Sequence, residues 1–246
     1  MGNSQSFIIA HFMNPAGAVV YDLTAKVCYV ACGFVSQTNG SFFALFSLTL
    51  SSGDKQKINN VFRNTTQFFA ITLALVGLYS ICFTEPVINY WVGLDKYGGT
   101  WLLVVIVLAK ILFQFRAYCN NILYTGGMIN KSAKLDILCA IVYIAILLAI
   151  IKPTQIYAIP IATLIVSLQL MRDNLSLDVR MLATEIVKSV LLILPFLVVH
   201  FILQLDYRNL YLYAGYFVVF SVAYFVVLYY INRTFFTSLL SKFHKR

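Results

Sequence analysis

Charged side chains are scarce in this chain. Asp, Glu, Lys and Arg make up only 11% of its 246 residues, whereas soluble globular domains carry about 25%. Hydrophobic residues account for 61% of the chain, and the mean hydropathy is +0.83. These values exclude an ordinary soluble domain and predict an integral membrane protein. The net charge of +9 is therefore interpreted as a guide to membrane topology, and we expect no nucleic-acid partner.

Metal-binding residues are few and scattered. The three histidines, His11, His200 and His244, lie far apart in the sequence. The five cysteines lie in apolar stretches without the C-x-x-C spacing of a metal site, so they are predicted to be buried small hydrophobic residues. They are Cys28, Cys32, Cys82, Cys119 and Cys139. We expect no metal site and no cofactor.

Sequence motifs of enzymes are also missing. The chain has no Gly-x-Ser-x-Gly nucleophile elbow, phosphate-binding loop or Gly-x-Gly-x-x-Gly fingerprint. Few acidic residues lie in the apolar stretches, and no close pair of them indicates acid–base chemistry. We therefore expect no catalytic residues and a protein that is not an enzyme.

Long apolar stretches predict an all-α, polytopic transmembrane helix bundle with about seven full spans in one region, residues 1–246. The predicted spans are Ala16–Leu50, Phe68–Phe83, Trp101–Asn121, Leu135–Ile151, Ile156–Met171, Leu182–Leu205 and Leu210–Ile231. We expect Glu85-Pro86 to stop the second span and Lys152-Pro153 to stop the fourth. Pro160 is expected to kink the fifth span or to lie in its first turn.

Positive charges collect in alternate loops. Eleven Lys and Arg residues fall on one side of the predicted membrane, namely Lys55, Lys57, Arg63, Lys131, Lys134, Arg172, Arg180, Arg233, Lys242, Lys245 and Arg246. The other side has Lys96, Lys152 and Arg208, with Lys26 if it lies outside the core. The positive-inside rule places the first side, and the C-terminus, in the cytoplasm. Seven spans then put the amino terminus outside, although no signal peptide is visible. We therefore expect either that residues 4–13 are the end of a partial span or that upstream helices are missing.

The predicted span Trp101–Asn121 carries a lysine near its middle. An ammonium at mid-bilayer depth costs at least about 2.5–3.5 kcal/mol, so Lys110 is expected to face a protein interior or a water-filled cavity. The small or polar side chains within about 40° of it on a helical wheel are Gln114, Ala117 and Asn121. Arg116 lies on an adjoining face. This stripe is the strongest indication of a functional site in the sequence.

The first predicted span has a comparable stripe. Its members are Asp22, Lys26, Gly33, Gln37, Gly40 and Ala44. Asp22 and Lys26 could be cavity charges that couple to an ion, although an interfacial ion pair at a helix start is the favoured interpretation. Gln37, Asn39 and Asn121 could contact hydroxyl groups of a bound ligand or form helix-to-helix hydrogen bonds.

Three motifs together resemble a known family of transporters. Val19-Val-Tyr-Asp-Leu-Thr-Ala-Lys26 with the later Ser51-Ser-Gly-Asp-Lys55 is similar to the eighth helix and following loop of bacterial polysaccharide flippases. Val87-Ile-Asn-Tyr-Trp-Val-Gly93 is similar to a periplasmic loop of these proteins, and Ile156–Ser167 resembles their twelfth helix, with Tyr157 and Pro160 where glycine is common. The family is the O-antigen and polysaccharide flippases of the multidrug/oligosaccharidyl-lipid/polysaccharide exporter superfamily.

The resemblance covers only the C-terminal part of such a flippase, so that the chain would correspond to the C-lobe and two further helices. It implies flipping of an undecaprenyl-diphosphate-linked oligosaccharide across the bacterial inner membrane for cell-surface polysaccharide, including O-antigen of lipopolysaccharide. The implied partners are the lipid bilayer, this substrate, and polysaccharide polymerase and chain-length components. Lys110, Gln114, Arg116, Asn121 and Gln37 would then line the substrate cavity.

Other interpretations remain open at this point. Lys110 could pair with an acid on a neighbouring helix, and Arg116 could extend to the cytoplasmic interface. The chain could instead be an ion-coupled multidrug exporter, which should have a clearer intramembrane acid than Asp22. A membrane-embedded polysaccharide polymerase or ligase should have a large extracytoplasmic loop, and the last alternative is a non-functional fragment.

Overall fold

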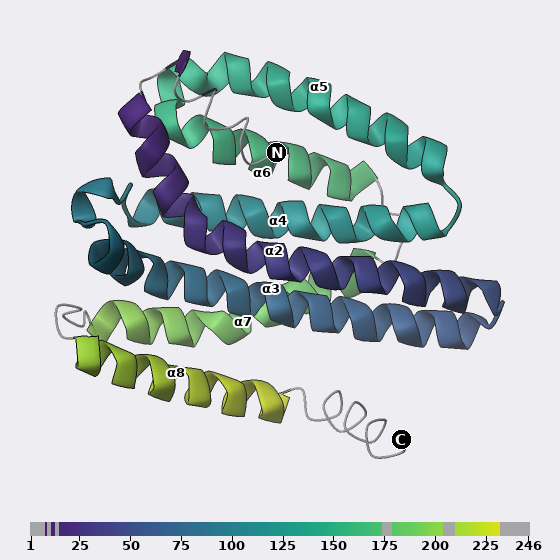
Figure 1. Cartoon of the computed structure of the whole chain (residues 1–246). Coiled ribbons are helices and arrows are strands. Elements are labelled where there is room, and N and C mark those ends of the chain that lie inside the picture. Colours follow the sequence, from purple (N-terminus) through teal and green to yellow (C-terminus); the bar gives the residue numbers. More distant parts are fainter. Residues whose placement is uncertain (1–7, 9–10, 13–14, 174–178, 204–209, 232–246) are drawn as a thin grey trace. The chain divides into compact units, whose positions relative to one another are not determined.

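The computed structural model describes residues 8, 11–12, 15–173, 179–203 and 210–231, and every regular element in these ranges is a helix (Figure 1). The long helices are α2 (Pro15–Ser51), α3 (Lys55–Trp91), α4 (Thr100–Thr125), α5 (Ile129–Thr154), α6 (Ala158–Asp173), α7 (Val179–Leu203) and α8 (Leu210–Ile231). Two short 3-10 helices, η1 (Leu94–Lys96) and η2 (Gln155–Tyr157), lie in connections. The predicted all-α fold class is confirmed.

The chain forms two compact units, residues 1–185 and 186–246. In the first unit, α4 is the central helix, because it contacts α2, α3, α5 and α6. Figure 1 shows α4 between α6 and α2. Its buried residues include Leu102, Leu103, Ile106 and Tyr118, which lie on several sides of the helix. A helix that is apolar around most of its circumference lies in a protein core or spans a membrane.

In the second unit, the last part of α7 packs against α8 through aromatic rings. The ring of Phe196 lies edge-on to those of Phe220 and Tyr224, with centroids 5.4 and 5.2 Å away. The Nδ1 atom of His200 lies 3.1 Å from the Tyr216 hydroxyl. His200 is therefore a hydrogen-bonded histidine within a helix pair, and the buried rings of Phe220 and Tyr224 on α8 serve packing.

The turn between α2 and α3 shows why a helix begins at Lys55. The side chain of Asp54 accepts hydrogen bonds from the backbone N–H groups of Gln56 and Lys57, at 2.9 and 3.1 Å. Such a cap satisfies N–H groups that the first helical turn leaves without partners. Gly53, before it, has a φ of +66°, which glycine adopts without steric cost.

The prediction that Glu85-Pro86 stops a helix is wrong. The helix α3 runs through Pro86 to Trp91, and Gly93 ends it with a φ of +91° while its N–H bonds to the Ile88 carbonyl at 3.1 Å. Packing on both sides of Pro86, with Phe83 and Ile88 buried, compensates for the single backbone hydrogen bond that proline removes.

The predicted stop at Lys152-Pro153 differs by one residue from the observed end of the helix. The helix α5 continues to Thr154, and the chain reverses at Gln155, whose φ is +49°. Pro160 lies in the first turn of α6, which confirms one of the two positions expected for it.

Four described helical stretches are long and apolar enough to cross a membrane, namely Pro15–Ser51, Lys55–Trp91, Thr100–Thr125 and Ser132–Leu168. The last one takes in α5 and α6, which η2 divides. Leu191–Ile202 and Gly215–Val227 are shorter apolar helices. The count of seven full spans stays a prediction, and most of the partial span predicted before Ala16 lies outside the described residues.

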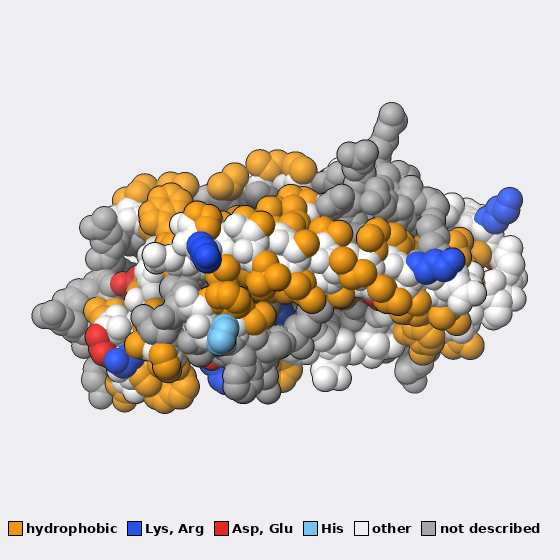
Figure 2. All heavy atoms as spheres, turned by 90° about the horizontal axis from the view of Figure 1, so that it is seen from above, with side chains coloured by type: hydrophobic (Ala, Val, Ile, Leu, Met, Phe, Trp, Pro, Cys, Tyr) orange, Lys and Arg blue, Asp and Glu red, His pale blue; other side chains and the backbone are white. Residues whose placement is uncertain are grey.

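The surface supports a membrane environment. Hydrophobic side chains cover much of the face shown in Figure 2, and Lys and Arg side chains are few there. On α5, six large apolar side chains are between 53% and 63% exposed, namely Ile129, Ile137, Leu138, Ile141, Ile144 and Leu148. Exposure of such an apolar surface to water is unfavourable, whereas contact with lipid chains is not.

Candidate functional site

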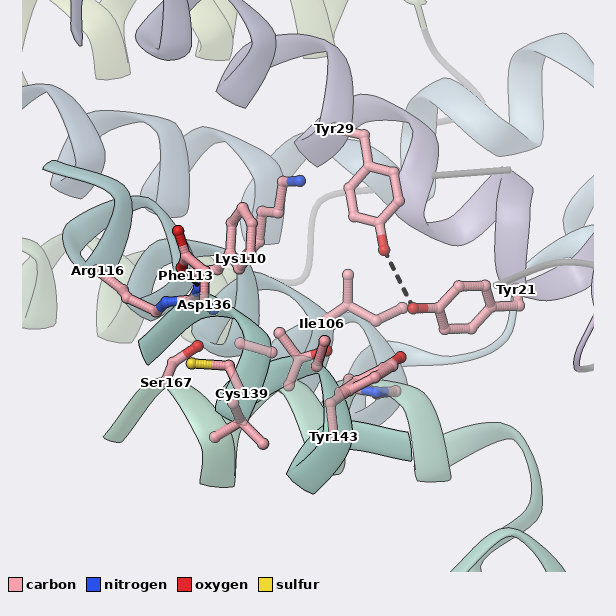
Figure 3. Close-up of a pocket in the computed structure, with 15 residues that line it drawn as sticks. Tyr21, Tyr29, Ile106, Lys110, Phe113, Arg116, Asp136, Cys139, Tyr143 and Ser167 are labelled. Atoms are coloured by element: carbon pink, nitrogen blue, oxygen red, sulfur yellow. Dashed lines mark hydrogen bonds and ion pairs between the residues drawn. The ribbon is translucent and has the colours of Figure 1, made fainter. Parts of the chain in front are cut away.

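A pocket lies within the first unit, between α2, α4, α5 and α6 (Figure 3). It contains about 680 Å³ of empty space, part of which is open to the surroundings. The polar and aromatic residues that line it are Tyr21, Tyr29, Lys110, Phe113, Arg116, Asp136, Cys139, Tyr143, Thr163 and Ser167. Its apolar lining comes from α4, α5 and α6. A largely apolar pocket with a few polar groups is the usual form of a ligand site.

Lys110 lies near the middle of α4. Ten residues separate it from Thr100 and fifteen from Thr125, which corresponds to about 15 Å and about 22 Å along the helix axis. Its Nζ atom lies 4.6 Å from the centroid of the Tyr29 ring on α2 and 5.2 Å from that of Phe113. Such cation–π contacts are worth about 0.5–2 kcal/mol each.

The lysine has aromatic rather than acidic neighbours. Lys96 pairs with Asp95 and Arg116 pairs with Asp136, whereas no carboxylate of the described residues lies within 4.0 Å of the Lys110 ammonium. The described residues therefore do not supply the acidic partner considered for Lys110 from the sequence.

Arg116, two turns along α4, forms an ion pair with Asp136 on α5. The Arg116 Nη2 atom lies 2.5 Å from Asp136 Oδ1, and the two side chains are 14% and 38% exposed. Asn120 Nδ2 donates to the other carboxylate oxygen at 3.0 Å, and Ser132 Oγ donates to Asn120 Oδ1. Arg116 is thus held across the helix pair rather than extended to an interface.

Asp136 was missed as a site residue from the sequence, although a signal exists. Gly126-Gly127 forms the turn between α4 and α5. Arg116 lies ten residues before Gly126, and Asp136 lies nine residues after Gly127. In an antiparallel helix pair, residues equally distant from the turn lie at the same level, so the two charges could have been paired.

Tyrosines and one serine complete the lining. The hydroxyls of Tyr21 and Tyr29 lie 3.1 Å apart, and Tyr143 of α5 faces them across the pocket (Figure 3). Ser167 of α6 is 1% exposed, and its Oγ atom has no hydrogen-bond partner among the described residues. Figure 3 shows this side chain beside Cys139, near the Arg116–Asp136 pair. A buried hydroxyl without a partner is costly, and a bound ligand could satisfy it.

The other two polar members of the predicted stripe on α4, Gln114 and Asn121, contact α2 and do not line the pocket. Gln114 Nε2 donates to the Cys32 carbonyl at 2.7 Å and to Ser36 Oγ at 2.8 Å. Asn121 Nδ2 donates to the Asn39 carbonyl at 3.4 Å. Gln114 and Asn121 therefore form hydrogen bonds between two helices. The sequence had offered this as one of two interpretations of Asn121.

Three further predicted residues on α2 also lie away from the pocket. Gln37, Asp22 and Lys26 are exposed and are not among the lining residues. The ion-coupling role considered for Asp22 and Lys26 stays a prediction. Of the five residues predicted to line a cavity, the structure brings Lys110 and Arg116 to one pocket.

The described residues contain no group of three or more His, Cys, Asp or Glu side chains placed to hold a metal ion. All five cysteines are buried and none forms a disulfide, which confirms the prediction that they act as small hydrophobic residues. The chemistry available in the pocket is therefore that of two cations, one carboxylate, hydroxyls and aromatic rings, which suits binding of an anionic amphiphile.

Comparisons with known proteins give no relative: no protein-family model, no curated protein and no solved structure matches the chain.

Proposed function

We propose that this protein takes part in moving a lipid-linked oligosaccharide, such as an undecaprenyl-diphosphate-linked glycan, across a bacterial inner membrane. The observation that carries the proposal is the Lys110 ammonium, which lies mid-helix at a pocket and has aromatic rings instead of a carboxylate beside it. A cation that costs several kcal/mol to insert is expected to have a function when no described acid neutralises it.

The pocket's chemistry suits the parts of such a substrate. The ammonium and guanidinium attract a diphosphate, and an apolar environment strengthens the attraction. Tyrosine hydroxyls at Tyr21, Tyr29 and Tyr143 provide hydrogen-bonding groups for a sugar, and the apolar lining from Ile106, Ala109 and Val166 is compatible with a lipid chain. The three resemblances in sequence to polysaccharide flippases agree with this assignment.

The orientation in the membrane is part of the proposal. The turns between α2 and α3 and between α4 and α5 lie at one end of the first unit (Figure 1). Exposed basic residues gather near these turns, namely Lys55, Lys57, Arg63 and Lys134. We place this end in the cytoplasm by the positive-inside rule. The C-terminus would lie on the same side if all seven predicted spans cross.

The experiment compares Lys110→Ala with the natural protein in cells whose surface polysaccharide depends on this protein. We expect the variant to lose most surface polysaccharide while the lipid-linked precursor accumulates in the inner membrane. Lys110→Arg, which keeps the charge, should retain part of the activity. Lys96→Ala is the matched control, because Lys96 is an exposed cation in the α3–α4 loop and should be dispensable. Normal surface polysaccharide in Lys110→Ala would refute the proposal.

One observation bears on the second candidate, an ion-coupled multidrug exporter. Asp136 is an acid of the kind that such an exporter needs within the membrane, and it lies at the pocket. The described charges of the pocket nevertheless sum to a net positive value, which disfavours the cationic compounds that many exporters carry. Uptake of a cationic dye into inverted vesicles, abolished by Asp136→Asn, would favour the exporter.

A further inference from the structure

Asp136 holds Arg116 in the structure, so an anion that enters the pocket meets a competitor for the guanidinium. The pocket's charged residues are Lys110, Arg116 and Asp136, two cations and one anion, with a net charge of +1. A diphosphate diester with two negative charges would bring the net charge to −1. Excess negative charge in an apolar site is unfavourable unless a proton or cation neutralises it.

We propose that the pocket takes up one proton together with an anionic head group, and that Asp136 accepts the proton as Arg116 transfers from this carboxylate to the anion. The inference rests on the proposed function and adds to it the identity of the co-bound ion and of its acceptor. In the step, a hydronium or buffer acid of the surrounding solvent transfers its proton to a carboxylate oxygen of Asp136 and leaves as water or buffer base, and the salt bridge to Arg116 is replaced by one to the ligand.

Asp136 is the acceptor because of what the other groups already hold. The titratable and charged groups around the pocket are Lys110 and Arg116 on α4, Tyr21 and Tyr29 on α2, and Asp136, Cys139 and Tyr143 on α5. The four lining residues of α6, Pro160, Thr163, Val166 and Ser167, do not titrate. An ammonium, a guanidinium, a phenol and a thiol already hold their protons in their ordinary forms, whereas a carboxylate has a free oxygen that can take one. Asp136 is then the lining group left to accept one.

The geometry allows the exchange without moving the helices. Asn120 Nδ2 holds Oδ2 of Asp136 at 3.0 Å, so the carboxylate keeps its position when Arg116 leaves Oδ1. The Arg116 guanidinium also lies 5.6 Å from the Phe113 ring, on the side of the pocket that carries Lys110. The Ser167 hydroxyl, buried and without a described partner, can donate to the entering anion.

The test measures proton uptake during binding to the full chain in lipid nanodiscs. The probe is farnesyl diphospho-N-acetylglucosamine, whose phosphates lack the second ionisation near pH 6 of phosphate monoesters, so it does not titrate between about pH 5 and pH 8. Calorimetry near neutral pH in two buffers of different ionisation enthalpy gives the protons taken up. We expect about one proton per probe in the natural protein and an affinity that rises up to about tenfold per unit fall in pH.

Four variants locate the acceptor. Asp136→Asn should bind the probe without proton uptake and without pH dependence, and Asp136→Glu should restore both. Lys110→Gln should bind more weakly but still take up a proton, which separates Asp136 from a neutral Lys110 as the acceptor. Asp95→Asn, a carboxylate in the α3–α4 loop that pairs with Lys96, is the matched control and should behave like the natural protein.

The outcomes separate this inference from the proposed function. If the natural protein binds the probe without proton uptake, or if Asp136→Asn still takes up a proton, the inference is overturned while the proposed function stands. If the natural protein does not bind the probe at all, both fail. Should Asp136→Asn not fold, the natural protein and Lys110→Gln decide the matter, since loss of uptake in Lys110→Gln would make Lys110 the acceptor.

Discussion

The side-chain amide of Gln114 lies 2.7 Å from the carbonyl oxygen of Cys32, and this contact joins the centre of α4 to α2. Gln114 is 3% exposed, and the same nitrogen donates to Ser36 Oγ at 2.8 Å. Gln114 lies one helical turn from Lys110 on α4, and Cys32 lies one helical turn from Tyr29 on α2. One stripe of polar residues on α4 therefore has two uses, helix association at Gln114 and a pocket at Lys110.

This division predicts that stability and ligand binding separate at neighbouring positions. Gln114→Ala should lower the free energy of unfolding by about 0.5–2 kcal/mol, because polar contacts between membrane helices are worth this much. Probe affinity in the folded fraction should stay unchanged. Thermal unfolding in nanodiscs measures the first quantity and calorimetry the second. Gln37→Ala, at an exposed position of α2, should alter neither, and a large loss of affinity in Gln114→Ala would instead place Gln114 in the binding site.

The loop before α4 provides a second prediction, at Gly98. Its N–H donates to Thr24 Oγ1 at 2.9 Å, and a Cβ atom there would lie 2.5 Å from Leu102 Cδ2 and 3.0 Å from the Thr24 hydroxyl. Gly98→Ala should therefore displace the loop from α2 and destabilise the protein by about 1–3 kcal/mol. Thermal unfolding tests this value.

The matched control for Gly98 is a glycine with space around it. A Cβ atom at Gly33 would have no neighbour within 4 Å, and alanine stabilises a helix interior by about 0.5–1 kcal/mol relative to glycine. Gly33→Ala should therefore unfold at the same temperature as the natural protein or slightly higher. Equal effects of the two substitutions would show that the loop does not depend on close packing at Gly98.

The same loop gives a prediction for pH. Burial raises the pKa of the Tyr97 hydroxyl to about 12, with a smaller opposing effect from its contact with Thr100, whereas an unfolded tyrosine has a pKa of about 10. The neutral phenol is favoured in the folded state, so its contribution to stability is complete below about pH 10 and is lost as the pH rises through about 12. Absorbance titration of the natural protein minus Tyr97→Phe should show a phenol that ionises near pH 12. A difference curve centred near pH 10 would mean that Tyr97 is solvated.

Local sequence patterns were sufficient for most helices. The predicted span Leu210–Ile231 has the same bounds as α8, and Trp101–Asn121 falls within α4, which glycines flank at both ends. Hydrophobicity and backbone hydrogen bonding decide whether a membrane helix forms, and both act over short distances in the sequence. The prediction that Pro86 stops a helix was wrong because the effect of a proline also depends on tertiary packing, which a local pattern does not show.

The sequence by itself determined that this is an all-α protein with several helices suited to a membrane, and that Lys110 lies deep within one of them. Tertiary structure alone decided which partner each polar side chain meets: rings of Tyr29 and Phe113 for Lys110, Asp136 for Arg116, and the backbone of α2 for Gln114. The physical reason is that these pairings depend on how each helix is rotated about its axis against its neighbours. That rotation results from side-chain packing between distant parts of the chain, which periodicity within one helix does not encode.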